Sequence, residues 1–388
     1  MAAFIPYGRQ NISQQDIDAV VSVLTSDWLT QGPMIDRFER AVADYCGVRY
    51  AVAVSSATAA LHIACMAAGL SVGDRLWTSP NTFIASANCG LYCGAGVDFV
   101  DIDPHTYNLD IRQLEQKLAV QANNSLPKVV VPVHFAGQSC DMAKVAALAQ
   151  RYGFTVIEDA SHAIGASYRG RPVGGCEFSD MAVFSFHPVK IITTGEGGMV
   201  LTNQTELYEK LVRLRSHGIT RNPDHMVGES HGPWYYQQLE LGFNYRMTDI
   251  QAALGVSQME RLSAFVERRR LLAKRYHERL ADLPVRWPFQ RSEAESSWHL
   301  YVIRLQLDQI RLSHCQVFKA LREKGIGVNL HYIPVHTQPY YQNLGFKWGD
   351  FPEAEQYYQE AISLPLYFGL TEADQDRVVS TLKQVIGA

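Results

Sequence analysis

Between Tyr50 and about Asn203, the sequence alternates short apolar runs with stretches of helical periodicity. The short runs are rich in β-branched residues and apolar almost throughout: YAVAVS, VDFVDI, KVVVPVHF, FTVIED, MAVFSF and GMVLTN. Strands with this pattern are covered on both faces, which is typical of parallel sheets. Helical stretches such as ATAALHIACMAAG and MAKVAALAQRYG separate them. The alternation predicts an α/β domain with a mostly parallel central sheet.

The segments on either side of this region predict an N-terminal arm with two helices and a smaller C-terminal domain. After a short arm that ends near Asn11, Ser13 is placed to cap a helix, and Pro33 is placed to begin the next one. The first helix would carry four apolar side chains on one face: Ile17, Val20, Val21 and Leu24. Farther along, the run that begins MTDIQAALG predicts one or two long helices, followed by a smaller unit of mixed strands and helices. We therefore expect a large α/β domain with the N-terminal arm over residues 1–250, and a connecting helix with a small α+β domain over residues 251–388.

The composition narrows the class of protein. The 388 residues are 47% hydrophobic and 19% charged, with a formal net charge of −4, which suits a globular protein and gives no basic stripe for nucleic acid. No window is apolar for long enough to cross a membrane, and the N-terminus lacks the features of a signal peptide. The seven cysteines include no C-x-x-C pair that would suggest a zinc or redox site. We expect a cytoplasmic protein without a metal site, a membrane contact or a nucleic-acid partner.

The first of three polar motifs follows the strand run that begins at Tyr50. In VSSATAALHIA, Ser56, Ala57 and Thr58 stand where a helix begins. Small residues at a helix N-terminus let backbone N–H groups approach a phosphate, and the Thr58 hydroxyl adds a donor. An ordinary helix capped by serine or threonine would give the same pattern.

The second motif, VIEDASHAIGA, places Glu158 and Asp159 at the end of an apolar strand, where a charge is costly unless it has a partner. An aspartate beneath a protonated pyridine nitrogen would keep that nitrogen charged and make the ring an electron sink. His162 would then contact the ring or its phenolic oxygen. The alternative is that Asp159 caps the following turn and that His162 is an interior histidine with satisfied hydrogen bonds.

The third motif is MAVFSFHPVKIITTGEGGMVLTN, in which Lys190 follows a strand and precedes a turn rich in glycine and threonine. Ser185, at the end of that strand, can point to the same pocket. A lysine among apolar neighbours can have its pKa lowered enough to form an imine with an aldehyde, whereas most single lysines are solvated loop residues. A phosphate cradle, an acid at a strand end and such a lysine, in this order, are what pyridoxal phosphate (PLP) requires.

The sequence resembles the sugar aminotransferases of the DegT/DnrJ family along essentially its whole length. The matching segments are WLTQGP, SSATAALHIA, TFIASAN, EDASHAIGA, VFSFHPVKIITTGEGGMVLTN, LRSHG, LGFNYRMTDIQAALG and HYIPVHTQPYY. The resemblance implies the PLP-dependent transferase fold of type I, an α/β fold with a large domain and a smaller C-terminal domain. Within the family, Tyr7 and the TFIASAN, SHAIG and HPVKIITTGEGG segments are most similar to the transaminases of pseudaminic acid synthesis.

The resemblance also implies roles for individual residues. Lys190 would hold PLP as a Schiff base and move protons, Asp159 would pair with the ring nitrogen, and Phe83 would stack on the ring. His162, at a position where many relatives carry glutamine, would bond the ring oxygen. The cofactor phosphate would be held by Ala57, Thr58 and Ser185, joined by Asn244 from the second subunit of a homodimer with shared active sites. The segments that line the sugar-nucleotide pocket in relatives correspond here to Tyr7, Trp28, Leu29, Thr30, Leu330, His331, Tyr332 and Ile333, together with Ala57, Ser185 and Asn244.

The function expected from the resemblance is an amino transfer in two half-reactions. Glutamate would donate the amino group, and the acceptor would be the 4-keto group of a UDP-linked 2-acetamido-2,6-dideoxyhexulose. The main alternative is another nucleotide-linked 4-keto sugar, of the perosamine or 4-amino-arabinose type. A PLP-dependent sugar dehydratase is a second alternative, but relatives of that kind replace the lysine by histidine. A catalytically silent protein that binds a nucleotide sugar would be expected to lack Lys190 or Asp159.

Overall fold

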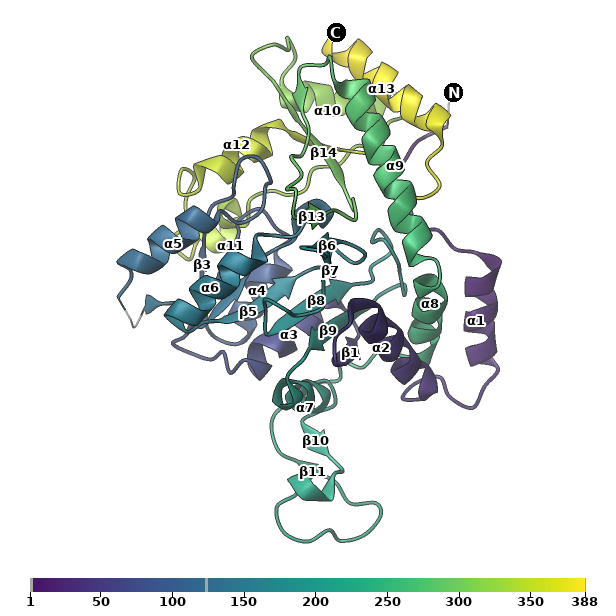
Figure 1. Ribbon diagram of the computed structural model, residues 1–388, viewed down its shortest axis with the longest axis vertical. Coiled ribbons are helices and arrows are strands. Elements are labelled where there is room, and N and C mark those ends of the chain that lie inside the picture. The colour runs from purple at the N-terminus through teal and green to yellow at the C-terminus, as the bar shows by residue number, and fades with distance from the viewer. Residues whose placement is uncertain (1–2, 123–124, 388) are drawn as a thin grey trace.

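The computed structural model describes residues 3–122 and 125–387. Its centre is a seven-stranded sheet with the order β1-β9-β8-β5-β4-β2-β3 (Figure 1). These strands are β1 (Tyr50–Val54), β2 (Arg75–Thr78), β3 (Gly96–Phe99), β4 (Val129–Val131), β5 (Thr155–Asp159), β8 (Met181–Ser185) and β9 (Gly198–Thr202). Strand β9 runs opposite to the other six strands, so the predicted, mostly parallel sheet is confirmed. All six predicted runs form strands, and β2 was not predicted because its four residues begin with an exposed arginine.

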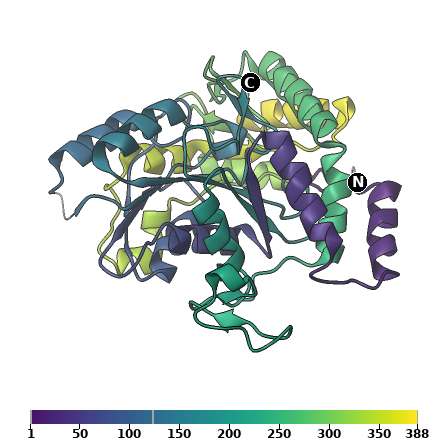
Figure 2. The ribbon, with the colours of Figure 1, turned by 60° about the horizontal axis from the view of Figure 1, so that its bottom comes forward.

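Helices cover the sheet on both faces (Figures 1 and 2). Those of the large α/β region are α2 (Pro33–Cys46), α3 (Ala57–Ala67), α4 (Ala85–Tyr92), α5 (Ile111–Val120), α6 (Met142–Tyr152) and α7 (Thr205–Leu214). Pro33 stands in the first turn of α2, as predicted, and Gly47 ends that helix with a left-handed φ of 68°. Short strands β6 (Ser167–Tyr168), β7 (Arg171–Pro172) and β13 (Ala294–Glu295) form a separate small sheet.

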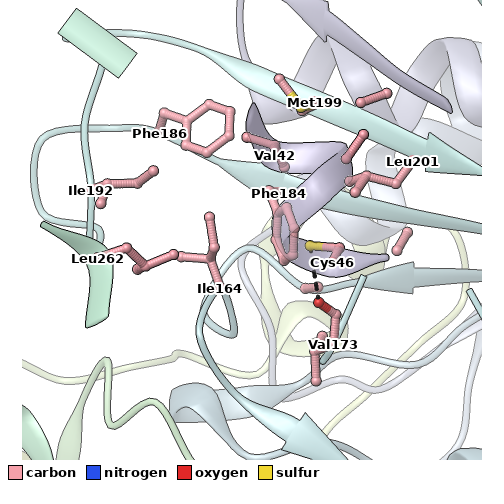
Figure 3. Close-up of a cluster of buried hydrophobic side chains, with 14 of the residues drawn as sticks. Val42, Cys46, Ile164, Val173, Phe184, Phe186, Ile192, Met199, Leu201 and Leu262 are labelled. Carbon is pink, nitrogen blue, oxygen red and sulfur yellow. Dashed lines mark hydrogen bonds between the residues drawn. The ribbon is translucent and has the colours of Figure 1, made fainter. Parts of the chain in front are cut away.

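One hydrophobic cluster fixes α2 against the sheet (Figure 3). Val42 of α2 packs with Phe184 of β8 and Leu201 of β9, and all three side chains are fully buried. Fully burying one such side chain stabilises the fold by about 1.5–3 kcal/mol. This cluster holds β8 and β9 in place, and the segment between these two strands contains Lys190.

The C-terminal region has its own sheet and its own hydrophobic cluster. The run that predicted one or two long helices forms two: α8 (Asp249–Met259) and α9 (Leu262–Leu280). The remaining elements are β12 (Val285–Arg286), β14 (Tyr301–Leu305), α10 (His314–Glu323), η4 (Val335–Thr337), α11 (Pro339–Gln342), α12 (Pro352–Glu360), β15 (Ala361–Leu364) and α13 (Glu372–Ile386). Strands β12, β14 and β15 pair antiparallel, which gives the mixed α and β content that was expected here. The domain boundary at residue 250 stays a prediction.

The N-terminal arm packs into this C-terminal region although it begins the chain. Ile5 is buried in the C-terminal cluster and forms a parallel bridge with Ile326. The Tyr7 carbonyl accepts a hydrogen bond of 3.0 Å from the backbone N–H of Leu366. These contacts fix the position of the Tyr7 side chain.

Helix α1 (Gln14–Leu24) begins at a Ser13 cap, as predicted, and is fastened to α8 by polar contacts. The buried carboxylate of Asp16 accepts hydrogen bonds from Ser257 at 2.7 Å and from Gln258 at 2.9 Å. The apolar side chains predicted to share one face are largely exposed; Leu24, for example, is 54% exposed.

The hairpin of β10 (Ile219–Thr220) and β11 (Gln237–Gln238), with the short helix η3 (Pro223–His225) between its strands, projects from the large α/β region (Figure 1). In the hairpin, Trp234 is 75% exposed. None of the helices in the described ranges is long and apolar enough to cross a membrane.

Candidate active site

A cavity of about 540 Å³ opens where β5 and β8 end, next to the start of α3. In open α/β sheets, ligands bind beyond the carboxyl ends of the strands. The cavity brings together eleven of the predicted site residues: Tyr7, Ala57, Thr58, Phe83, Asp159, His162, Ser185, Lys190, Leu330, His331 and Tyr332. The three polar motifs therefore meet in one place, with the N-terminal arm and the 329–332 segment closing the cavity.

Among the residues that the structure describes, the start of α3 offers this cavity backbone donors that have no acceptor. The Ser56 hydroxyl caps the helix by accepting a hydrogen bond of 3.1 Å from the backbone N–H of Ala59. The N–H groups of Ala57 and Thr58, in the first turn, have no acceptor within the helix. Gly198 of β9 lies against this turn, and a Cβ atom there would come within 2.5 Å of the Ala57 nitrogen. With the buried Ser185 hydroxyl beside them, these donors fit a phosphate group.

Asp159 ends β5 with its carboxylate held by two donors. The Ser86 hydroxyl donates to Oδ2 at 2.5 Å, and the Ser161 backbone N–H donates to Oδ1 at 3.1 Å. Ser86 is itself 2.7 Å from the Thr82 hydroxyl. Both hydroxyls belong to the TFIASAN segment, for which the sequence predicted a role for Phe83 alone. A fixed, buried carboxylate of this kind fits the nitrogen of a pyridinium ring.

Glu158, the neighbour of Asp159, has the partner that a charge at a strand end needs. Its carboxylate lies 2.5 Å from Nε2 of the fully buried His134, and the Ser179 hydroxyl donates to the same carboxylate at 2.5 Å. Glu158 points away from the cavity, since it does not line it. The two adjacent acids therefore serve different purposes: Glu158 is part of the core structure, and Asp159 faces the site.

Lys190 lies in the turn after β8, where its backbone N–H donates to the His187 carbonyl at 2.8 Å. Burial lowers the pKa of its amine from the usual 10.5 to about 8, although the nearby charge of Asp159 acts in the opposite direction. An amine with this pKa is partly neutral near pH 7 and can act as a nucleophile or a base. Lys190 is thus not the solvated loop lysine of the alternative interpretation.

His162 has both ring nitrogens engaged inside the protein. The Ala136 backbone N–H, in the short helix η2 (Phe135–Gly137), donates to Nδ1 at 3.2 Å, so the ring hydrogen must sit on Nε2. Nε2 lies 3.0 Å from the Tyr332 hydroxyl oxygen. Burial and the neighbouring Lys190 keep the pKa of His162 well below its usual value, so the ring is neutral. The Tyr332 oxygen accepts this bond, and its own proton remains free for another partner.

Five predicted residues do not line the cavity: Trp28, Leu29, Thr30, Asn244 and Ile333. Ile333 is 47% exposed just beyond the lining segment. Asn244 is exposed and bridges to Ser216. The others lie in the turn before α2, where Thr30 bridges to Thr248.

A family profile and a curated relative both match almost the whole chain. The profile described as the DegT/DnrJ/EryC1/StrS aminotransferase family matches residues 10–383. The spore coat polysaccharide biosynthesis protein SpsC of Bacillus subtilis is 39% identical over 386 residues, which cover 99% of this chain and 97% of that protein.

Solved structures agree with this result. Helicobacter pylori PseC, an aminotransferase involved in the biosynthesis of pseudaminic acid, superimposes with a TM-score of 0.90 at 30% identity, covering 99% of both chains. The PLP form of the putative sugar aminotransferase Spr1654 from Streptococcus pneumoniae superimposes with a TM-score of 0.89 at 29% identity, again over 99% of both chains. Its PMP form is similar to the same degree. The fold is that of the PLP-dependent aminotransferases, as predicted.

Proposed function

Since this chain belongs to the DegT/DnrJ/EryC1/StrS aminotransferase family, we propose that its cavity passes an amino group from glutamate, through PLP, to the 4-keto group of a nucleotide-linked sugar. Sugar aminotransferase chemistry and the PLP cofactor are properties of the family. The observation that carries the proposal is the Lys190 amine, with its pKa lowered to about 8, in one cavity with Asp159 and the free N–H groups of α3.

Different residues of the cavity would hold the phosphate and the ring of the cofactor. The N–H groups of Ala57 and Thr58 and the hydroxyl of Ser185 would hold the phosphate. Asp159, fixed by Ser86, would keep the ring nitrogen protonated, and Phe83 would cover the ring. When bound, PLP supplies an electrophilic aldehyde and an electron-accepting ring.

Lys190 would be the residue that moves protons. Its neutral amine would remove a proton from the amino-bearing carbon of the donor, and the resulting ammonium would deliver a proton to the carbon that was the cofactor's aldehyde carbon. Because the amine has a pKa of about 8, both its forms are populated near neutral pH. Asp159 raises the pKa of this amine and so keeps the protonated form accessible.

We propose that His162 acts through Tyr332. The Nε2–H of His162 points at the Tyr332 oxygen 3.0 Å away, which orients the tyrosine hydroxyl so that its proton faces the cavity. The hydrogen bond to the ring oxygen that the resemblance assigns to His162 would then come from Tyr332. Burial raises the pKa of Tyr332, so this hydroxyl keeps its proton at neutral pH.

For the substrate, we propose a UDP-linked 2-acetamido-2,6-dideoxy-4-hexulose of the L-arabino configuration. The product would be UDP-4-amino-4,6-dideoxy-N-acetyl-β-L-altrosamine. The support is the similarity to PseC and the presence of Tyr7 and the segment 330–332 at the cavity. The second candidate is another nucleotide-linked 4-keto sugar, of the perosamine or 4-amino-arabinose type, and the 39% identity to a spore coat polysaccharide biosynthesis protein is the reason to test it.

The deciding experiment is mass spectrometry of the products from UDP-, GDP- and dTDP-linked 4-keto sugars with saturating glutamate. Wild-type protein should form one amino sugar, and Lys190→Ala should form none, whereas the exposed-surface control Lys319→Ala should behave as wild type. Normal turnover by Lys190→Ala would end the aminotransferase assignment.

Initial rates on the L-arabino sugar and its D-xylo epimer test the substrate proposal. The epimers differ at one ring carbon, and one unpaired buried group costs about 1–3 kcal/mol, so we expect a preference of about ten- to a hundredfold. Equal rates, or a preference for a GDP- or dTDP-linked sugar, would refute the substrate and leave the aminotransferase activity standing.

A further inference from the structure

Three cysteines meet where α3 packs against α4. Cys65 of α3 and Cys89 of α4 are fully buried in one hydrophobic cluster. Cys93, the residue at which α4 ends, packs against that cluster and is only partly buried. Because Cys89 and Cys93 are one helical turn apart, they lie on the same face of α4. Cys65 faces both of them and forms a side-chain hydrogen bond with each.

His62, one turn before Cys65 in α3, adds an imidazole to this group. One of its ring nitrogens, Nδ1, lies 3.2 Å from the Tyr245 hydroxyl oxygen. Its ring centroid is 5.4 Å from that of Tyr92 in α4. The His62 side chain also forms a hydrogen bond with the Cys93 thiol. Cys93 therefore has two hydrogen-bonding neighbours, both of them in α3.

The surroundings of Cys93 favour its thiolate. Hydrogen bonds with Cys65 and with His62 lower the pKa of the Cys93 thiol to about 6, although burial acts in the opposite direction. At pH 7, a thiol with this pKa is ionised in about ten molecules of eleven, against about one in thirty for an ordinary cysteine. Hydrogen bonds with Cys89 and Cys93, together with burial, raise the pKa of Cys65 well above its usual value. A partly exposed thiolate thus lies beside a buried thiol.

The other four cysteines lack this arrangement. Cys46, Cys140 and Cys176 are buried, and the thiol of each donates to a backbone carbonyl. Cys315 is exposed, but it lies in α10 of the C-terminal region. Over residues 3–122 and 125–387, a partly exposed cysteine in contact with a second thiol occurs only at Cys93.

We propose that Cys93 and Cys65 are a peroxide-reactive thiol pair that forms a disulfide between α4 and α3. The Cys93 thiolate attacks one oxygen of hydrogen peroxide, the O–O bond breaks, and the departing hydroxide takes up a proton to become water. This step leaves Cys93 as a sulfenic acid. The Cys65 thiol then attacks the Cys93 sulfur, the S–O bond breaks, and a second water leaves with the Cys65 proton. The net change oxidises two thiols to a disulfide and reduces one peroxide to two waters.

The disulfide joins two helices that support the cofactor site. Helix α3 begins with the free N–H groups of Ala57 and Thr58, and α4 carries Ser86, whose hydroxyl donates to Asp159 at 2.5 Å. The two sulfurs of a disulfide are about 2.05 Å apart, which is closer than two thiols in contact. The end of α4 must therefore move toward α3 when the bond forms. This movement shifts Ser86 and weakens its hydrogen bond to Asp159.

Mass spectrometry of the PLP-loaded protein after treatment with hydrogen peroxide tests the thiol pair. Wild type and Cys315→Ser, which lacks the exposed thiol, should both form a disulfide that joins the peptides of Cys65 and Cys93. Cys89→Ser should form it too, because a serine there can keep the 3.2 Å hydrogen bond to the Ser86 carbonyl. Cys93→Ser should form none. Equal disulfide formation in Cys93→Ser would overturn the proposal, since Cys65 would then pair with Cys89.

A second variant, Cys65→Ser, separates the two steps of the reaction. Its serine hydroxyl can still donate a hydrogen bond to the Cys93 thiolate, but it cannot close a disulfide. The sulfenic acid at Cys93 should therefore persist and react with dimedone, whereas wild type should take up little dimedone. If Cys93 is oxidised neither in wild type nor in Cys65→Ser, the thiol is not peroxide-reactive and the proposal fails.

Equilibrium dialysis of PLP tests the link to the cofactor site. Oxidised wild type should bind PLP about tenfold more weakly than reduced wild type, the effect of one weakened hydrogen bond, and dithiothreitol should restore the affinity. Cys93→Ser treated with peroxide should bind PLP as before. If wild type with the disulfide formed binds PLP as tightly as the reduced protein does, the coupling to the cofactor site is refuted.

Discussion

Lys190 should react with amine reagents at a pH where ordinary lysines do not. Burial lowers the pKa of its amine from 10.5 to about 8. At pH 7, an amine with a pKa of 8 is neutral in about one molecule in eleven, against about one in three thousand for an ordinary lysine. The neutral, reactive fraction is therefore about 300-fold larger. This gain makes imine formation with an aldehyde feasible at neutral pH.

The measurement is competitive acetylation of the cofactor-free protein from pH 6 to 11, with mass spectrometry of the Lys190 peptide and a free lysine peptide in the same tube as reference. Labelling of Lys190 should reach half of its maximum near pH 8. In Asp159→Asn the midpoint should fall further, because the Asp159 charge raises the pKa of the amine. A wild-type midpoint near 10.5 would refute the argument that burial activates this lysine.

Three substitutions test the residues that would hold the ring and the phosphate of the cofactor. Asp159→Asn should slow proton abstraction by about 10²-fold or more in stopped-flow traces, since a fixed charge at the ring is lost; near wild-type rates would mean that another acid pairs with the ring. Ser86→Ala removes the 2.5 Å hydrogen bond to Asp159 and should lower kcat by about tenfold with KM for glutamate unchanged in steady-state assays; a change in KM alone would contradict this. Gly198→Ala places a Cβ 2.5 Å from the Ala57 nitrogen and should weaken PLP binding by about tenfold in equilibrium dialysis, whereas Gly96→Ala, with its nearest atom at 3.7 Å, should not.

The parts of the fold and site that the sequence predicted depend on local pattern. The buried strands and the helix starts at Ser13, Pro33 and Ala57 follow from periodicity and capping chemistry. Nine of the eleven predicted site residues in the cavity lie in segments that match the family, and only Tyr7 and Leu330 lie outside them. Strand β2 is too short and too charged at its start to give a clear pattern.

What the sequence did not predict depends on contacts between distant segments. Ser86, in α4, meets Asp159 at the end of β5 only in the folded chain, because 73 residues separate the two in sequence. Likewise, the tautomer of His162 is set by the Ala136 backbone and its partner is Tyr332, 170 residues away. Side-chain identity alone indicates that such residues are able to bond, but not with which partner.

The attachment of the N-terminal arm to the C-terminal region has a consequence for protein synthesis. Tyr7 precedes Leu366, whose N–H binds its carbonyl, by 359 residues. At about 5–20 residues per second, the ribosome needs roughly 20–70 s to make the intervening chain. During that time the strands carrying Asp159 and Lys190 are able to fold, while Ile5 has no apolar surface to cover it. A chain released before residue 366 would contain the three motifs, but Tyr7 would not be held against the cavity by Leu366. The N-terminal arm therefore becomes part of the site only after the segment around Leu366 has been made.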